Sequence, residues 1–184
     1  MFDNEQVKKL LKLARNSIES YFSKKDYDFS KDKKEFKEKQ GVFVTLKTRE
    51  EELRGCIGFP YPILPLSEAI FQAARAAAFS DPRFFPLSKE ELENIKIEIS
   101  VLSVPEEIKC EKEKLLDEIR IGKDGLIVQL GGFSGLLLPQ VALEWRWNSL
   151  EFLENCCDKA GLDRDEWKEK DCKIFKFQAQ IFSE

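Results

Sequence analysis

Hydrophobic and polar residues alternate along the chain with two periods, which predict where its helices and strands lie. Apolar residues recur at helical spacing over 5–22, and this predicts an amphipathic helix. Strict alternation over 95–102 places β-branched residues on one face, as in a half-buried antiparallel strand. Between them, an alanine-rich stretch from Ser67 to Phe79 predicts a helix, because serine is a good N-cap and alanines allow close packing against a sheet.

The same patterns predict hairpins. Two apolar stretches, Val42–Lys47 and Leu53–Gly58, flank the polar turn Thr48–Glu52 and are expected to pair. Gly131–Gly135 lacks the Lys-Ser/Thr ending of a phosphate-binding loop, so we interpret it as another hairpin turn. Further strands are predicted at 119–121, 126–130, 133–138 and, as one long strand, 172–182, and helices are predicted to begin at Pro139, Asn148 and Asp163. The charged segment 23–40 is expected to be a surface connection with a short helix.

This order of elements indicates the fold class. Strands and helices alternate irregularly and hairpins are frequent, which favours an α+β fold over a doubly wound parallel sheet. A chain of 184 residues is long enough to bury a hydrophobic core.

The charge of the chain limits the classes of partner that it is expected to bind. The net charge is −4, and acids and bases are mixed along the chain, of which 35% is charged. Nucleic-acid-binding proteins usually carry a basic face or a high pI, so a pI near 5.3 argues against that class. The N-terminus lacks the pattern of a signal peptide and no apolar run approaches ~20 residues, so we expect a cytoplasmic protein with no membrane partner.

The cysteines and the absence of histidine exclude several chemistries. There are five cysteines, an odd number at irregular spacing, which argues against a disulfide framework. With no histidine and no C-x-x-C, we expect no metal site and no cofactor. The chain alone cannot build a Ser-His-Asp or Cys-His site.

The segment Leu53–Gly58 (Leu-Arg-Gly-Cys-Ile-Gly, here called the signature hexapeptide) carries the main candidate chemistry. In a strand, Arg54, Cys56 and Gly58 share one face. A guanidinium beside a thiol favours the thiolate, so Cys56 is a candidate catalytic nucleophile, the alternative being a small buried residue. Arg54 is a candidate anchor for a ligand carboxylate, phosphate or carbonyl, or else a salt-bridge partner.

The signature hexapeptide resembles that of the AMMECR-type domain family. Companion stretches follow in the same order: Gly41–Leu46, Asp81–Phe84, Leu137–Val141, Phe152–Leu153, Lys159–Leu162 and Gln180–Phe182. The resemblance implies a single AMMECR-type domain over 1–184, with two unequal lobes, each an antiparallel sheet with flanking helices, and a cleft between them. In this sequence the large lobe maps to about 1–104 plus 171–184, and the small inserted lobe to about 105–170.

The resemblance also implies that the signature hexapeptide faces the cleft. The candidate ligand-binding residues are Arg54, Gly55 and Gly58 with Cys56 on one wall, Gln140 and Glu144 on the other, and Asp81 and Arg83 on a rigid turn nearby. Two functions stay open. The first is a protein that binds a peptide, protein segment or small organic ligand, with or without thiol-dependent catalysis. The second is a non-catalytic module that docks a partner protein, and nucleic-acid binding is a weaker third.

Overall fold

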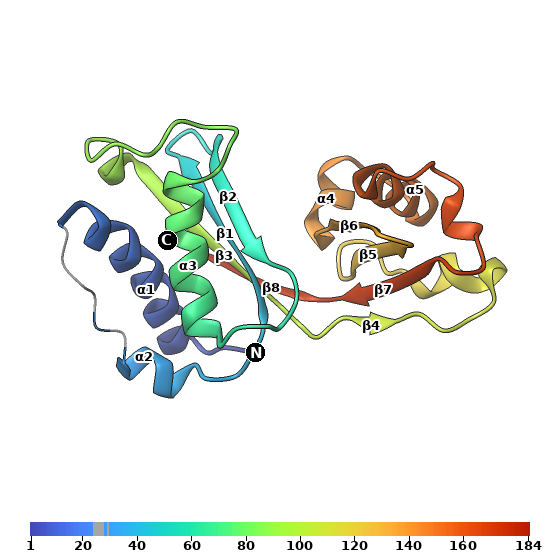
Figure 1. The fold of residues 1–184 in the computed structure, drawn as a ribbon, viewed down its shortest axis with the longest axis horizontal. Coiled ribbons are helices and arrows are strands. Elements are labelled where there is room, and N and C mark those ends of the chain that lie inside the picture. Colours follow the sequence, from blue (N-terminus) through green and yellow to red (C-terminus); the bar gives the residue numbers. More distant parts are fainter. Residues whose placement is uncertain (24–27, 29) are drawn as a thin grey trace. The chain divides into compact units, whose positions relative to one another are not determined.

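The structure, a computed structural model, describes residues 1–23, 28 and 30–184. It contains two four-stranded antiparallel sheets with flanking helices (Figure 1), which confirms the predicted α+β class. Contacts within the chain divide it into two units: Met1–Leu102 with Gln180–Glu184, and Ser103–Ala179. We call these the first and the second unit.

The sheet of the first unit has the strand order β2-β1-β3-β8. Its strands are β1 (Gly41–Thr48), β2 (Leu53–Phe59), β3 (Ile95–Leu102) and β8 (Ala179–Ser183), and its helices are α1 (Asn4–Ser23), α2 (Ser30–Glu35), α3 (Leu66–Phe79) and the short η1 (Leu92–Asn94). The β1–β2 hairpin is confirmed, with Thr45 opposite Cys56. Helix α3 packs on α1 and on the two hairpin strands (Figure 1).

The core of the first unit follows the predicted alternation. Leu46 lies between Gly55 on β2 and Ile97 on β3, and it is fully buried. Five of the six alanines of α3 are buried, so small side chains on the helix allow it to approach the sheet closely.

The sheet of the second unit has the strand order β4-β7-β5-β6. Its strands are β4 (Glu106–Glu107), β5 (Gly125–Leu130), β6 (Phe133–Leu137) and β7 (Lys173–Phe177), and its helices are η2 (Lys112–Glu118), α4 (Pro139–Glu144), α5 (Ser149–Ala160) and η3 (Glu166–Lys168). Helix α5 begins at a capping box of Asn148 and Glu151 and ends at Gly161, whose φ is 77°, as expected for a C-terminal glycine. The β5–β6 hairpin across Gly131 is also confirmed.

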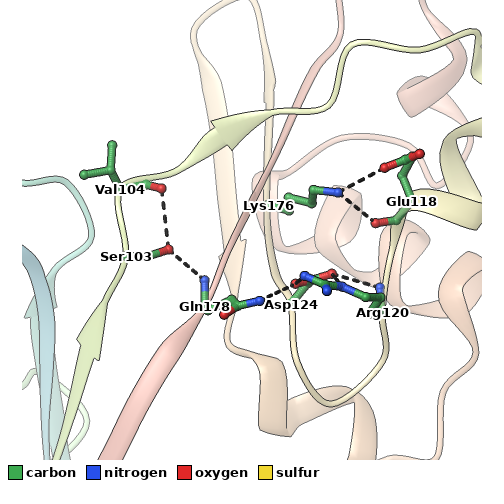
Figure 2. Close-up of polar contacts among 7 residues, drawn as sticks. All are labelled: Ser103, Val104, Glu118, Arg120, Asp124, Lys176 and Gln178. Carbon is green, nitrogen blue, oxygen red and sulfur yellow. Dashed lines mark hydrogen bonds and ion pairs between the residues drawn. The ribbon is translucent and has the colours of Figure 1, made fainter. Parts of the chain in front are cut away.

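Residues 119–121 were predicted to be a strand, and this prediction is wrong. They belong to a loop that Arg120 and Asp124 close (Figure 2). Oδ2 of Asp124 accepts hydrogen bonds from the main-chain N and the Nε of Arg120, each at 3.0 Å, and Oδ1 accepts one from Nη2 at 3.0 Å. The buried carboxylate therefore fixes the loop.

The single long strand predicted over 172–182 is in fact two strands, β7 and β8, which lie in different sheets. Gln178 separates them (Figure 2): its main-chain N donates to Oγ of Ser103 at 2.9 Å, and its carbonyl accepts from the N of Ser103 at 2.8 Å. Apolar alternation continues through the break, so the hydrophobic pattern could not reveal it.

The expected short helix in 23–40 is confirmed by α2, while residues 24–27 and 29 of that segment lie outside the described residues. In the part of the chain that the structure describes, no helix is long and apolar enough to cross a bilayer.

Candidate functional site

The signature hexapeptide forms most of β2, an edge strand of the first sheet. Gly55 faces α3 so closely that a Cβ atom there would lie 2.2 Å from the carbonyl oxygen of Ala77. Because side chains alternate along a strand, Arg54 and Cys56 lie on the other face of the sheet. Gly58 is packed as tightly, since a Cβ atom there would lie 2.3 Å from the carbonyl oxygen of Val42.

Arg54 is held by a bidentate ion pair with Glu91. Its Nε lies 2.8 Å from Oε1 and its Nη2 lies 3.1 Å from Oε2, while Nη2 also donates to the carbonyl of Phe85 at 3.1 Å. The Arg54 side chain is 13% exposed, and its hydrogen bonds to Glu91 lower the pKa of that carboxyl. The remaining nitrogen, Nη1, is buried and has no hydrogen-bond partner among the described residues.

Arg54 also lines an open hollow of about 550 Å³ in the first unit. The other residues around it come from the β1–β2 turn and from the segment before β3: Thr48, Arg49, Glu50, Glu90, Glu91, Asn94 and Ile95. Two arginines and three glutamates make its lining mixed in charge, with a small acidic excess. Such a surface is suited to a ligand that carries both hydrogen-bond donors and acceptors rather than to a polyanion.

Cys56 is partly exposed, and its Sγ accepts a hydrogen bond from Oγ1 of Thr45 at 3.3 Å. The guanidinium that binds the main chain of Cys56 is that of Arg83, whose Nη2 donates to the Cys56 carbonyl at 3.3 Å. The pKa of Arg83 is raised chiefly by its hydrogen bonds to Asp81, with a smaller contribution from Cys56. The sequence predicts Arg54 beside the Cys56 thiol. In the structure the Arg54 side chain forms its ion pair with Glu91.

Asp81 joins this cluster from the turn after α3, and its side chain is 1% exposed. Oδ2 accepts from the main-chain N of Cys56 at 2.9 Å and from Nη2 of Arg83 at 2.7 Å, while Oδ1 accepts from the Nε of Arg83 at 2.9 Å. These bonds, above all those from Arg83, hold the pKa of Asp81 far below its usual value despite burial. Asp81 is therefore ionised at neutral pH, and together with Arg83 it covers the outward main-chain N and O of Cys56 on this edge strand.

The structure thus brings six of the eight predicted site residues into one unit: Arg54, Gly55, Cys56, Gly58, Asp81 and Arg83. Gln140 and Glu144 lie on α4 in the second unit. Oε1 of Gln140 is buried without a partner among the described residues, and Glu144 is exposed. Within the described residues, no group of three Cys, Asp or Glu side chains is placed to hold a metal ion.

The residue that sequence reasoning missed is Glu91. Its spacing from Ser88 predicts a capping box, and the structure has that box: Oε2 accepts from the N of Ser88 at 2.8 Å. The same carboxylate pairs with Arg54, which lies 37 residues away, and no local pattern signals that contact.

The cysteines divide into accessible and buried thiols, which predicts their reactivity. Burial raises the pKa of Cys156 to about 12 and that of Cys157 to about 11, and it also raises the pKa of Cys172. In the native protein at pH 7.5 we expect a maleimide to label Cys110 first and Cys56 more slowly, with the other three protected until the chain unfolds. Peptide mapping by mass spectrometry gives the order. Native labelling of Cys156 as fast as that of Cys56 would contradict the packing described above.

Comparisons with known proteins agree with one another. A family model described as AMMECR1 matches residues 11–182. The protein PYRAB00100 of Pyrococcus abyssi is 49% identical over 181 residues, which are 95% of this chain and 88% of that protein. A protein of Aquifex aeolicus is 45% identical over 180 residues, covering 97% of this chain and 92% of the relative. The crystal structure titled uncharacterized protein PH0010, from Pyrococcus horikoshii, superposes with a TM-score of 0.92 at 48% identity, covering 100% of this chain and 93% of that one.

Proposed function

This chain belongs to the AMMECR1 family, and we propose that it is a binding protein that takes a peptide or protein segment at Arg54, in the hollow beside strand β2. The proposal rests on the uneven hydrogen bonding of the Arg54 guanidinium, of which only Nε and Nη2 have partners among the described residues. One edge is fixed by Glu91 and the Phe85 carbonyl, while Nη1 has no partner among the described residues.

An unpartnered buried donor is costly, because it has lost water without gaining a protein acceptor. The penalty is larger for a charged group, so a native guanidinium in this state calls for an explanation. A carbonyl or carboxylate oxygen of a ligand would satisfy Nη1 once the groups that cover this nitrogen in the free protein move aside. Because Glu91 already fixes the plane of the guanidinium, little orientational freedom is lost when that oxygen binds.

The hollow favours a peptide over other ligands. A peptide main chain presents a carbonyl acceptor for Arg54 and N–H donors for the surrounding glutamates. Phe85, whose carbonyl touches Arg54, is 91% exposed and offers an apolar contact for a side chain of the segment. The excess of glutamates over arginines around the hollow disfavours nucleic acid.

Binding without catalysis is favoured over thiol chemistry. A nucleophilic thiol needs a base, and the chain has no histidine. The carboxylate beside Cys56 is Asp81, which is a weak base because its pKa is lowered and which already accepts hydrogen bonds from Cys56 and Arg83. The participation of Gln140 and Glu144 in the same site stays a prediction.

The test is a peptide selection against matched variants. A random-peptide phage library is selected on the wild-type protein, and the dissociation constants of the enriched peptides are measured by fluorescence anisotropy. We expect Arg54→Gln to weaken binding by about tenfold or more, which is ~1.4 kcal/mol. Cys56→Ser should bind as the wild type does, because the proposal assigns no chemistry to the thiol.

Arg164→Gln is the matched control, because Arg164 is also paired with a carboxylate, that of Asp158, but lies in the second unit. Circular dichroism verifies that each variant is folded. Peptides that bind the wild type and a folded Arg54→Gln variant equally well would overturn the proposal, as would a selection that enriches no peptide.

A further inference from the structure

The two sheets have four edge strands, β2, β8, β4 and β6, and three of them are protected. The middle of β2 is covered by Asp81 and Arg83. Beside β8 lies the N-terminal segment, since the Gln180 side chain binds both the N and the O of Phe2, at 2.8 and 3.0 Å. The edge strand β4 is only two residues long and both are glutamate. Such devices prevent uncontrolled strand pairing.

Strand β6 has none of these devices. Its sequence, Phe-Ser-Gly-Leu-Leu, contains no charge and no proline. It lies in the longest uncharged stretch of the chain, between Asp124 and Glu144, although 35% of the residues are charged. Phe133 is 59% exposed. The main chains of Ser134 and Leu136 make no hydrogen bond outside the sheet to any described residue.

We propose that β6 pairs with β6 of a second copy of this chain, which joins two four-stranded sheets into one. An edge strand presents N–H and C=O groups at alternate residues, and another extended strand matches them. In an antiparallel pair about a two-fold axis, each copy supplies the same strand, so the interface is closed.

The second copy fits β6 because the strand is complementary to itself. An antiparallel register centred on Gly135 places Phe133 opposite the partner subunit's Leu137, so each end of the ladder buries an apolar pair. No like charges oppose one another, since β6 has none. Helix α5 packs on one face of β6 at Gly135, where a Cβ atom would lie 2.4 Å from the N of Ala160, so this contact holds the strand in place.

The test measures mass against concentration. Sedimentation velocity from about 1 to 500 μM should show a monomer–dimer equilibrium for the wild type. Phe133→Lys should raise the dimer dissociation constant by about tenfold or more, because the substitution appears twice in a symmetric interface and adds charge beside an apolar pair. Hydrogen exchange by mass spectrometry should show that protection of 131–138 increases with protein concentration.

Leu143→Lys is the matched control, since Leu143 lies on α4 and its exposure of 57% is close to the 59% of Phe133. It should dimerise as the wild type does. The proposal is overturned by a wild type that stays monomeric throughout, by a dimer that Phe133→Lys leaves unchanged, or by equal losses in both variants. If β6 instead pairs with a strand of a different protein, the wild type would stay monomeric throughout. None of these outcomes bears on peptide binding at Arg54.

Discussion

Replacing Gly55 with alanine is expected to lower the free energy of unfolding of the first unit by about 3 kcal/mol or more. The new Cβ atom would lie 2.2 Å from the carbonyl oxygen of Ala77 and 3.1 Å from its carbonyl carbon. Both atoms belong to the main chain of α3, so no side-chain rotation can relieve the clash and the helix must separate from the sheet. Urea denaturation followed by circular dichroism measures the effect.

Gly132→Ala is the control for this substitution. Nothing lies within 4 Å of a Cβ atom at Gly132, so we expect a change of no more than about 0.5 kcal/mol. If Gly55→Ala were as stable as Gly132→Ala, α3 could not lie against β2 as described. A large loss would assign the first glycine of the signature hexapeptide to the contact between helix and sheet rather than to a ligand.

The fold could be predicted where the determining contacts are local in sequence. The alternation over 95–102 gave the buried face of β3, and Asn148 with Glu151 gave the start of α5, because a cap lies three residues from its partner. The break between β7 and β8 could not be found this way. It depends on hydrogen bonds of Gln178 to Ser103, which is 75 residues away.

The candidate site shows the same limit. Strand alternation correctly separates Arg54 and Cys56 from Gly55, since this depends only on neighbouring residues. The partners of these groups come from elsewhere in the chain: Asp81 is 25 residues from Cys56, and Glu91 is 37 residues from Arg54. The pairing of each arginine with its carboxylate depends on how the segment after α3 folds back along β2. Hydrophobic periodicity carries no information about the path of that segment.

The second large effect is expected from Asp81→Asn, which should lower the free energy of unfolding by about 3 kcal/mol at pH 7. The substitution removes the charge that pairs with Arg83. It also places an amide NH₂ group, a donor, at one of two oxygens that each accept two hydrogen bonds. Asp158→Asn, which breaks an exposed pair with Arg164, should cost less than about 1 kcal/mol and is the control.

The pH dependence of this difference follows from the lowered pKa of Asp81. Its stabilising contribution is fully present above the unfolded-state pKa of about 3.9 and is lost as the pH falls through the still lower folded-state pKa. The gap in stability between the wild type and Asp81→Asn should therefore be constant from pH 7 to about pH 5 and narrow below about pH 4. Urea titrations at pH 7, 5 and 3 measure it. A gap that widens in acid would contradict the assignment of Asp81 as a buried, ionised acceptor.

The same variant connects stability with the candidate site. Because Asp81 accepts the main-chain N–H of Cys56, its loss should loosen the edge of β2 and speed maleimide labelling of Cys56 at pH 7.5. Labelling of Cys156, which is buried in the core of the second unit, should stay as slow as in the wild type. If both rates rose together, the variant would have lost global stability only. Unfolding of the first unit alone would also expose Cys56, because the other four cysteines lie in the second unit. A faster rate at Cys56 while hydrogen exchange of the buried strand β1 stays slow would show that the turn carrying Asp81 and Arg83 closes this edge of the sheet.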